Sequence, residues 1–506
     1  MTAGWIKDEF GERLAGMRSQ VHHRYTSGLP EGDEHPYRTG PWRPQVTEWD
    51  AWELDVEGTI PADLNGTYLR NTENPLFDNK RTYHPFEGDG MLHSMTFENG
   101  AARYANRFVQ TDSFKAEQEA GRSLWAGIAE SPKLAERPGF GARGFMRDAA
   151  STDVVVHHGS ALASFYQCGE LYRLDPVTLE QQGVLGWVGD TPELKGWGVS
   201  AHTKIDENTG EMLFFSYATE APYLRYGIVG ADGLLKHTQD IPVPGSRLPH
   251  DMAFTKDYAI LNDCPLYWEP ELMERGIYAN VFHPELPTRF AIVPRMGGDI
   301  QWFEADPTFV LHWTNAYQDG DEIVLDGFHQ GDPAPQARPE DGPYDKIFRF
   351  LDLYRMQARH HRWRFNLRTG ATTEEHLSER IMEFPAINQR FGGRPYRYAY
   401  NAVSKPGWFL FNGLVKHDVL AGTEQLVSFP KGVFCSEAVF APRTGSSLLT
   451  TAEDDGYLLT YTIDMNTDRS DCWIFAAQDL AAGPVAKVAL PERIASGTHA
   501  YWSAAS

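Results

Sequence analysis

Four histidines stand out from the eighteen in the sequence because each lies beside or within a segment typical of a β-strand. His202 stands in "SAHTK", His250 opens "HDMAFTKDYAILND", His312 lies in "FVLHWTNAY", and His499 lies in "SGTHAYW". Imidazole is a common ligand of iron, zinc, copper and nickel. A metal centre is therefore one chemistry that these residues could support.

The spacing of these histidines does not match a local metal-binding motif. They are separated by 48, 62 and 187 residues, whereas a motif such as HExxH takes its ligands from a single helix. They can meet only in a fold that brings distant segments to one point.

The surrounding chain predicts such a fold. Segments such as "GTYLRN", "DVVVHHGSALASFY" and "EMLFFSYAT" are rich in β-branched and aromatic residues, and turn-forming stretches such as "FENGAARY" and "DENTGEML" separate them. Hairpins in series over most of 506 residues favour an all-β, seven-bladed β-propeller over a sandwich. The inner strand of each blade lines the propeller axis, so histidines from different blades can converge there.

Helical patterns are confined to residues 113–131 and 344–362, and the second follows the Pro/Asp/Gly-rich loop "GDPAPQARPEDGP". We expect them to form a helical and loop cap over one face of the propeller, as insertions at about 112–147 and 328–362. The expected organisation is an N-terminal extension over 1–44, followed by one propeller domain over 45–506.

Composition excludes several partners. A formal net charge of −23 would repel nucleic acid and anionic membrane surfaces. The apolar runs fall short of the roughly 18 residues that a membrane span needs, and the first residues do not form a secretory signal, so we expect a cytoplasmic protein. Spaced apolar residues from Trp5 to Met17 predict a short amphipathic helix, which we expect to pack on the protein itself rather than on a membrane.

The four cysteines are the last candidate metal ligands, and they lie far apart without a CxxC pair. This spacing argues against a zinc ribbon or a redox motif. We expect reduced, mostly buried thiols.

Eight segments in one order resemble the carotenoid cleavage oxygenase superfamily: "FEGDGMLHSMTFENG", "SAHTKIDENTGEMLFF", "HDMAFTKDYAILND", "LHWTNAY", "EFPAIN", "EAVFAPR", "AEDDGYLLT" and "SGTHAYW". The resemblance covers the chain from about residue 45 to its end. It is strongest to the bacterial lignostilbene dioxygenases and isoeugenol oxygenases, as in "YLRNTENP" and "RFVQTDSFKAEQEAGRSL".

The resemblance implies a capped seven-bladed propeller that holds a non-haem Fe(II) with His202, His250, His312 and His499. The ligand types alone also suit zinc, so the identity of the metal depends on the resemblance. The family orients its ligands with three glutamates. Glu383 and Glu437 match two of them, while the third position carries Gln167, or Tyr166 after a one-residue shift. Glu170 lies close by but aligns poorly.

The other histidines receive structural roles. His84 and His93 flank "FEGDGML", which in this family is a glycine-rich turn rather than a set of ligands. We expect the pair at 157 and 158 to lie at a strand edge, and the pair His360 and His361 to lie on the surface of a helix.

The implied reaction is cleavage of an alkene C=C bond with O2 into two carbonyl products. Relatives that cleave 4-hydroxystilbenes hold the phenol with a tyrosine and a lysine, and these positions match Tyr104 and Arg143 here. Arginine keeps the positive charge but cannot act as a base. Equally, Arg143 could be a solvated loop residue, and Arg147 or Lys133 could then supply the positive charge at the phenol.

Two classes of function therefore compete. The favoured class is an oxygenase, acting on a stilbenoid or phenylpropenoid alkene or alternatively on an apocarotenoid. The other is a propeller that binds such a ligand without converting it. The complete histidine set favours the enzyme, while the oligomeric state and any membrane contact of the cap stay open.

Overall fold

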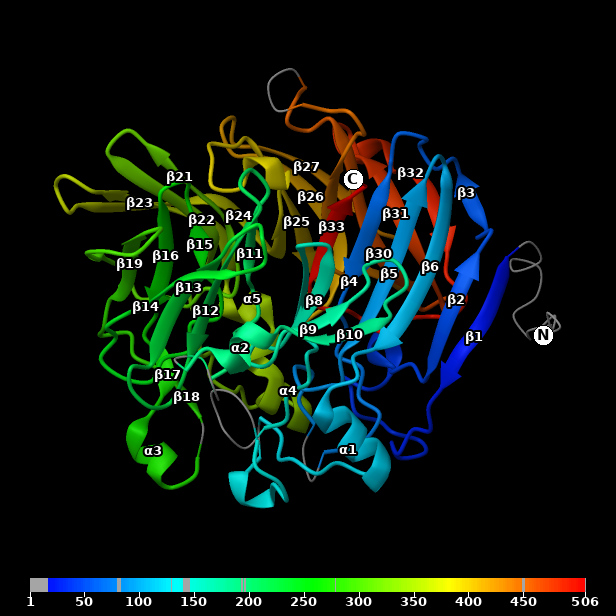
Figure 1. Ribbon diagram of the computed structural model, residues 1–506, viewed down its shortest axis with the longest axis horizontal. Helices are drawn as coiled ribbons and strands as arrows, with labels where there is room; N and C mark the ends of the chain where they lie inside the picture. Colours follow the sequence, from blue (N-terminus) through cyan, green and yellow to red (C-terminus); the bar gives the residue numbers. More distant parts are fainter. Residues whose placement is uncertain are drawn as a thin grey trace.

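Short antiparallel strands are the main secondary structure of the computed structural model, which describes residues 17–79, 83–128, 130–139, 146–192, 194, 197–277, 279–447 and 451–505 (Figure 1). The predicted helix between Trp5 and Met17 lies almost wholly outside these residues. No helix in the described ranges is long and apolar enough to cross a membrane.

The first sheet joins strands from both ends of the chain. Its order is β1-β2-β6-β5-β4-β33, and its strands are β1 (Arg18–Arg24), β2 (Thr47–Trp52), β4 (Gly66–Arg70), β5 (Met91–Glu98), β6 (Ala101–Phe108) and β33 (Ala500–Ala504). Strand β33 pairs antiparallel with β4, from Ala500 opposite Arg70 to Ala504 opposite Gly66. The last strand thus completes the sheet that the N-terminal strands begin.

Three four-stranded sheets follow in chain order. The first contains β7 (Asp153–His157), β8 (Ser160–Ser164), β9 (Tyr172–Leu174) and β10 (Gln181–Val184). The second contains β11 (Lys204–Asp206), β12 (Glu211–Tyr217), β13 (Leu224–Val229) and β14 (Leu235–Asp240). The third contains β15 (Ala253–Phe254), β16 (Tyr258–Asp263), β19 (Thr288–Pro294) and β20 (Gln301–Ala305), and a hairpin of β17 (Leu266–Trp268) and β18 (Asn280–Phe282) extends from it.

The remaining strands form a continuous path that divides into three blades. They are β21 (Trp313–Asp319), β22 (Glu322–Gln330), β23 (Ala358–Asn366), β24 (Thr372–Ala386), β25 (Tyr398–Ser404), β26 (Phe411–Asp418), β27 (Thr423–Ser428), β28 (Val433–Cys435), β29 (Val439–Pro442), β30 (Gly456–Asp464), β31 (Arg469–Ala476), β32 (Pro484–Ala489) and β3 (Val56–Gly58). The first part of β24 pairs with β23 and its last part with β25, so this strand passes from one blade to the next. With the four preceding sheets, these blades confirm the predicted seven-bladed propeller.

Apolar side chains fill the interfaces between neighbouring blades. Between the sheets that begin at β11 and β15, for example, Leu213, Tyr226, Leu261 and Trp268 form one buried cluster. Alternation along each strand directs one set of side chains into such an interface. All four cysteines are buried and unpaired, as predicted.

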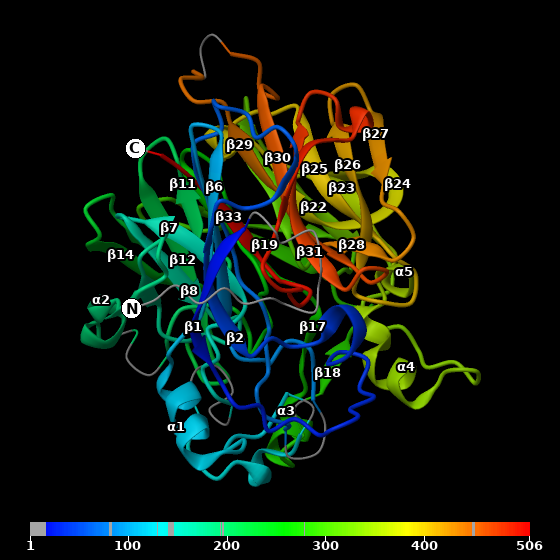
Figure 2. The same ribbon diagram turned by 90° about the vertical axis from the view of Figure 1, so that its right-hand side faces the viewer.

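The helices are short, and three of them lie toward one end of the molecule. They are α1 (Asp112–Ala120), α2 (Gly186–Asp190), α3 (Pro270–Glu274), α4 (Pro343–Phe348) and α5 (Leu353–Met356). In both views α1, α3 and α4 lie below the sheets (Figures 1 and 2). Helix α1 lies in a connection between two blades, whereas α3 and α4 lie in insertions within single blades. Their common position agrees with a cap over one face.

One prediction about the cap is wrong. The helical pattern expected over 344–362 ends at Met356, because Gln357 takes a left-handed conformation with φ 55°. His360 and His361 instead lie on β23, where they pair with Phe328 and Gly327 of β22 and are 0% and 5% exposed. Pairing with β22 and β24 outweighs the local helical preference of this segment.

Candidate metal centre

Each of the four predicted histidines lies just before the edge strand of a different sheet. His202 precedes β11, His250 precedes β15, His312 directly precedes β21, and His499 directly precedes β33. These four strands are the inner strands of their blades. Consecutive histidines of this set are up to 187 residues apart in the sequence. The propeller therefore brings distant residues to one place on its axis.

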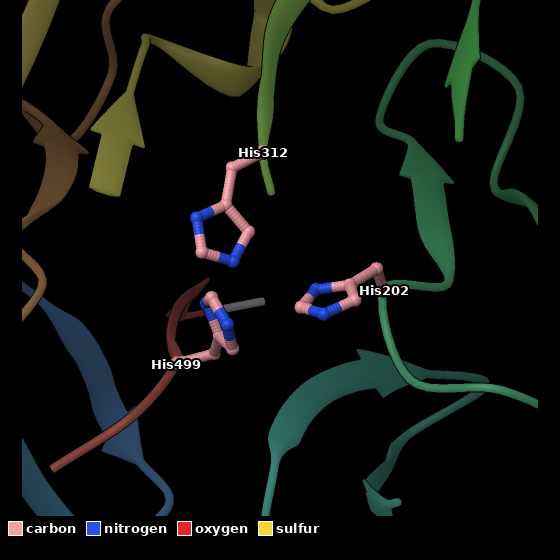
Figure 3. A group of neighbouring side chains, drawn as sticks. All are labelled: His202, His312 and His499. Carbon is pink, nitrogen blue, oxygen red and sulfur yellow. The ribbon is translucent and has the colours of Figure 1, made fainter. Parts of the chain in front are cut away.

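The four imidazoles lie together; His202, His312 and His499 are buried, and His250 is half-buried. His202 lies 4.7 Å from His250, 5.2 Å from His312 and 4.5 Å from His499, measured between ring centroids. The distance from His312 to His499 is 4.6 Å, and from His312 to His250 it is 5.4 Å. Nitrogen atoms of His202, His312 and His499 all lie within 4.8 Å of one another, and these rings point toward a common centre (Figure 3).

The donor set of this group fits a metal ion. The Nε2 atoms of His202 and His312 are buried and have no hydrogen-bond partner among the described residues. Burial lowers the pKa of His202, His250 and His312 well below the usual value, and the neighbouring imidazoles lower it further. Neutral imidazoles with free nitrogen atoms are what a transition metal requires.

Two buried glutamates orient two of the rings. Glu383 Oε2 lies 2.5 Å from His312 Nδ1, and Glu437 Oε2 lies 3.2 Å from His499 Nδ1. Burial lowers the pKa of His499, but the carboxylates of Glu437, Asp153 and Asp251 together outweigh burial, so the net pKa is raised. A carboxylate at Nδ1 fixes the tautomer that leaves Nε2 for a metal.

The strand geometry explains why Glu383 reaches the centre. It lies where β24 leaves β23 and begins to pair with β25, opposite Ala402, and the next residue, Phe384, has a positive φ of 53°. Its carboxylate also accepts the backbone N–H of Phe384 at 2.6 Å. Burial raises the pKa of Glu383 to about 8, although the Phe384 amide and the nearby histidines lower it.

The third orienting carboxylate that the resemblance implied is not found beside His250 in the described residues. None of the hydrogen bonds within the described ranges reaches the His250 ring, and the amide of Gln167 is buried without a partner there. The ring of Tyr166 lies 6.1 Å from that of His250. Glu170 instead donates its backbone N–H to Asp148.

Two aspartates that the sequence reasoning missed hold the backbone of the ligands. Asp153 accepts the N–H of His202 at 3.1 Å, where His202 itself has a left-handed φ of 68°. Asp251 accepts the N–H of Trp313 at 2.9 Å and pairs with Lys204 Nζ at 2.6 Å, which links three of the ligand segments. The adjacency of Asp251 to His250 in "HDMAF" was the available signal.

The histidine group separates two cavities. The polar cavity contains His202, His312 and His499 together with Asp153, Lys204, Asp251 and Asn315. The apolar cavity is narrow, with a volume of about 20 Å³, and is lined by Glu73, Phe86, Thr152, Tyr166, His250, Leu311, His312, Phe384, Phe409, Thr498 and His499. A larger apolar ligand would have to displace some of these side chains, and it would then lie directly against the imidazoles.

Tyr104, one of the two predicted substrate contacts, is not among the residues that line these cavities. Tyr104 lies in β6, 1% exposed, and its hydroxyl is bonded to His93 Nδ1 at 2.8 Å within the blade core. Arg143 lies outside the described residues. Arg147 is buried against Asp89 and Glu117, and Lys133 is exposed on the cap. Contact of Tyr104 or Arg143 with a substrate stays a prediction.

The fold and site define the class of β-propellers that have a histidine group on the axis, able to hold a metal ion, and an apolar cavity beside it. A family model described as retinal pigment epithelial membrane protein, RPE65, matches residues 42–504. The chain belongs to this family, the carotenoid cleavage oxygenases, as the sequence motifs indicated.

Similar proteins include known oxygenases. The chain is 31% identical to carotenoid 9,10(9',10')-cleavage dioxygenase 1 of Phaseolus vulgaris, covering 95% of this chain and 91% of that protein. It is also 31% identical to isoeugenol monooxygenase of Pseudomonas putida, covering 92% and 98%. The crystal structure of Pseudomonas brassicacearum lignostilbene dioxygenase superposes with a TM-score of 0.81 at 27% identity, covering 94% and 100%.

Proposed function

We propose that the chain is a non-haem Fe(II)-dependent oxygenase that cleaves an alkene C=C bond with O2 and gives two carbonyl products. The observation that carries this proposal is the buried group of His202, His312 and His499, with the His250 ring 4.7 Å from that of His202. When bound, a ferrous ion would supply the activation of O2 that the reaction needs, because four neutral imidazoles leave its charge intact and leave coordination positions free.

The protein's own residues hold the ligands and shape the space for the alkene. Glu383 and Glu437 fix the tautomers of His312 and His499. Leu311, Phe384 and Phe409 line the apolar cavity against the imidazoles, so a conjugated alkene that displaces these side chains would lie there with little access for water.

The proposed substrate is a stilbenoid or phenylpropenoid with a 4-hydroxyphenyl group. The likeness to an isoeugenol monooxygenase and to a lignostilbene dioxygenase supports it. An apocarotenoid is the second candidate, because the likeness to a plant carotenoid cleavage dioxygenase is equally high. An aromatic, apolar cavity suits both classes.

The test is anaerobic reconstitution with Fe(II), followed by incubation in air with resveratrol, isoeugenol, lignostilbene and an apocarotenal. The expected result is about one iron per chain and aldehyde products from the 4-hydroxyphenyl alkenes. Products from the apocarotenal alone would support the second candidate. An iron-loaded chain that binds these compounds but converts none would show a propeller that only binds.

A further inference from the structure

Glu73 is a buried carboxyl group in the wall of the apolar cavity. It follows β4 in the segment "RNTENP", is 2% exposed, and forms an isolated bridge with Gly90. The backbone on either side is fixed, since Met91 donates to Thr72 at 3.1 Å and Asn74 donates to Asp89 at 2.8 Å. The side chain therefore has a defined position opposite the cavity walls that carry the histidines.

Neither carboxyl oxygen of Glu73 has a partner at hydrogen-bonding distance and angle among the described residues. The hydroxyl of Ser151 and the backbone N–H of Gly88 are close enough to lower the pKa of Glu73, and the Ser151 hydroxyl too is buried without a bond of normal geometry. Burying an unpaired carboxyl group costs several kcal/mol, by order of magnitude, and most buried polar groups are paired. A group of this kind in a cavity wall indicates a missing partner, which a ligand can supply.

The neighbouring charged side chains are paired with groups other than Glu73. Arg147 is the adjacent cation, and its guanidinium pairs with Asp89 at 2.6 Å and with Glu117, while it also donates to the carbonyl of Glu87 at 2.8 Å. Within the described ranges no ion pair joins Arg147 to Glu73. The carboxyl of Glu73 thus faces the cavity rather than the ion network behind it.

Burial raises the pKa of Glu73 well above its usual range, although the Ser151 hydroxyl and Arg147 lower it. The neutral acid is therefore favoured. A protonated carboxyl group donates one hydrogen bond through its O–H and accepts another through its C=O.

We propose that Glu73 binds the substrate through a hydroxyl group, so that the apolar cavity selects hydroxylated alkenes. This inference deepens the proposed function and rests on it. A hydroxyl group can accept from the acid and donate to its carbonyl, whereas a methyl ether can only accept and an unsubstituted ring can do neither. Leaving the carboxyl unpaired would then disfavour the analogues without a hydroxyl.

The experiment compares three stilbenes, 4-hydroxy, 4-methoxy and unsubstituted, with iron-loaded wild type, Glu73→Gln and Glu73→Leu. Anaerobic binding is followed by stilbene fluorescence, and kcat/KM is measured in air. Wild type should prefer the hydroxy compound over the methoxy compound by about tenfold or more. Glu73→Leu should reduce this ratio to about one at unchanged iron content, while Glu73→Gln, whose amide still donates and accepts, should keep most of it.

Glu48→Gln is the matched control, because Glu48 is also buried but lines neither of the two cavities and accepts the Phe108 N–H. It should leave the ratio unchanged. An unaltered preference in Glu73→Leu, or a wild type that cleaves all three stilbenes equally, would overturn the role of Glu73 while the oxygenase stands. Absence of cleavage by iron-loaded wild type on every alkene tested would instead overturn the proposed function.

Discussion

At the scale of single residues, the centre depends on which nitrogen each imidazole presents. His312 and His499 are bonded through Nδ1 to Glu383 and Glu437, so Nε2 is left for a metal. His202 is fixed instead through its backbone, by Asp153. The ligands thus differ in support: loss of a histidine removes a donor atom, whereas loss of a glutamate only releases a ring.

Replacing any one of His202, His250, His312 or His499 by Ala should abolish turnover and lower the iron content, because each substitution opens the coordination shell. Iron per chain and product formation are the measurements. His22→Ala is the control, since His22 lies on the exposed strand β1. Full activity in one of the four variants would remove that residue from the proposed ligand set.

Glu383→Gln and Glu437→Gln should reduce kcat/KM by about 10- to 100-fold, the usual range for residues that orient a metal ligand. The loss should be less complete than in the histidine variants, since the imidazoles remain. Steady-state kinetics with matched iron loading tests this. Wild-type rates in both variants would mean that the bonds to Nδ1 have no part in the reaction.

What the sequence could reveal at this scale depended on motif context. The histidines and the two glutamates lie in segments that resemble the family, so they could be placed without a structure. Glu73 could not be, because nothing in "RNTENP" indicates that its carboxyl faces a cavity. Tyr104 was expected at the substrate but is bonded to His93, a cross-strand contact between β5 and β6 that no local pattern encodes.

At the scale of elements, the centre depends on strands that close or cross between blades. Strand β24 carries Glu383 at its crossing point, and β33 begins directly after His499. The sequence predicted the propeller because strands and turns can each be recognised from a short stretch of residues. The prediction of a helix over 344–362 was wrong because His360 and His361 lie on a strand that pairs with β22 and β24, and the local sequence does not encode this pairing.

Gly66→Ala should loosen the pairing of β4 with β33. A Cβ atom at Gly66 would lie 2.5 Å from the Ser503 carbonyl oxygen and 2.6 Å from the Trp502 ring, and φ there is +148°. Such overpacking typically costs about 1–3 kcal/mol. Because β33 positions His499, we expect a lower melting temperature together with faster loss of iron.

Thermal unfolding and iron retention on dialysis against a chelator measure the two effects. Gly186→Ala is the control: it lies in α2, and its added Cβ would meet Asp190 at an ordinary 3.4 Å. If Gly66→Ala matched wild type in both measurements, closure by β33 would have no bearing on the metal centre.

At the scale of the whole molecule, burial affects two kinds of titratable group in opposite ways. It raises the pKa of Glu87 to about 8 and of Asp148 to about 7. Stability from these neutral acids is present at low pH and is lost as pH rises from their unfolded values through 7 and 8. Burial lowers the pKa of His360 to about 3 and of His329 to about 4, which acts in the other direction.

The buried histidines should make the fold sensitive to acid. His360 is neutral in the folded state down to about pH 3 but takes a proton below about 6.5 once unfolded. Each pH unit of that window removes up to about 1.4 kcal/mol from the free energy of unfolding. Within the same window the buried carboxyl groups gain stability as pH falls, so the wild-type profile alone cannot separate the two contributions.

A single substitution separates them. In His360→Asn the residue no longer titrates, so the free energy of unfolding should fall less steeply than in wild type as pH decreases from about 6.5 to 4.5. The slope is the relevant quantity, because the lost contacts with Thr314 and His417 lower stability at every pH. Denaturant unfolding at several pH values provides it, and His158→Asn, at an exposed turn, should keep the wild-type slope. Parallel profiles for wild type and His360→Asn would show that His360 does not contribute to acid sensitivity.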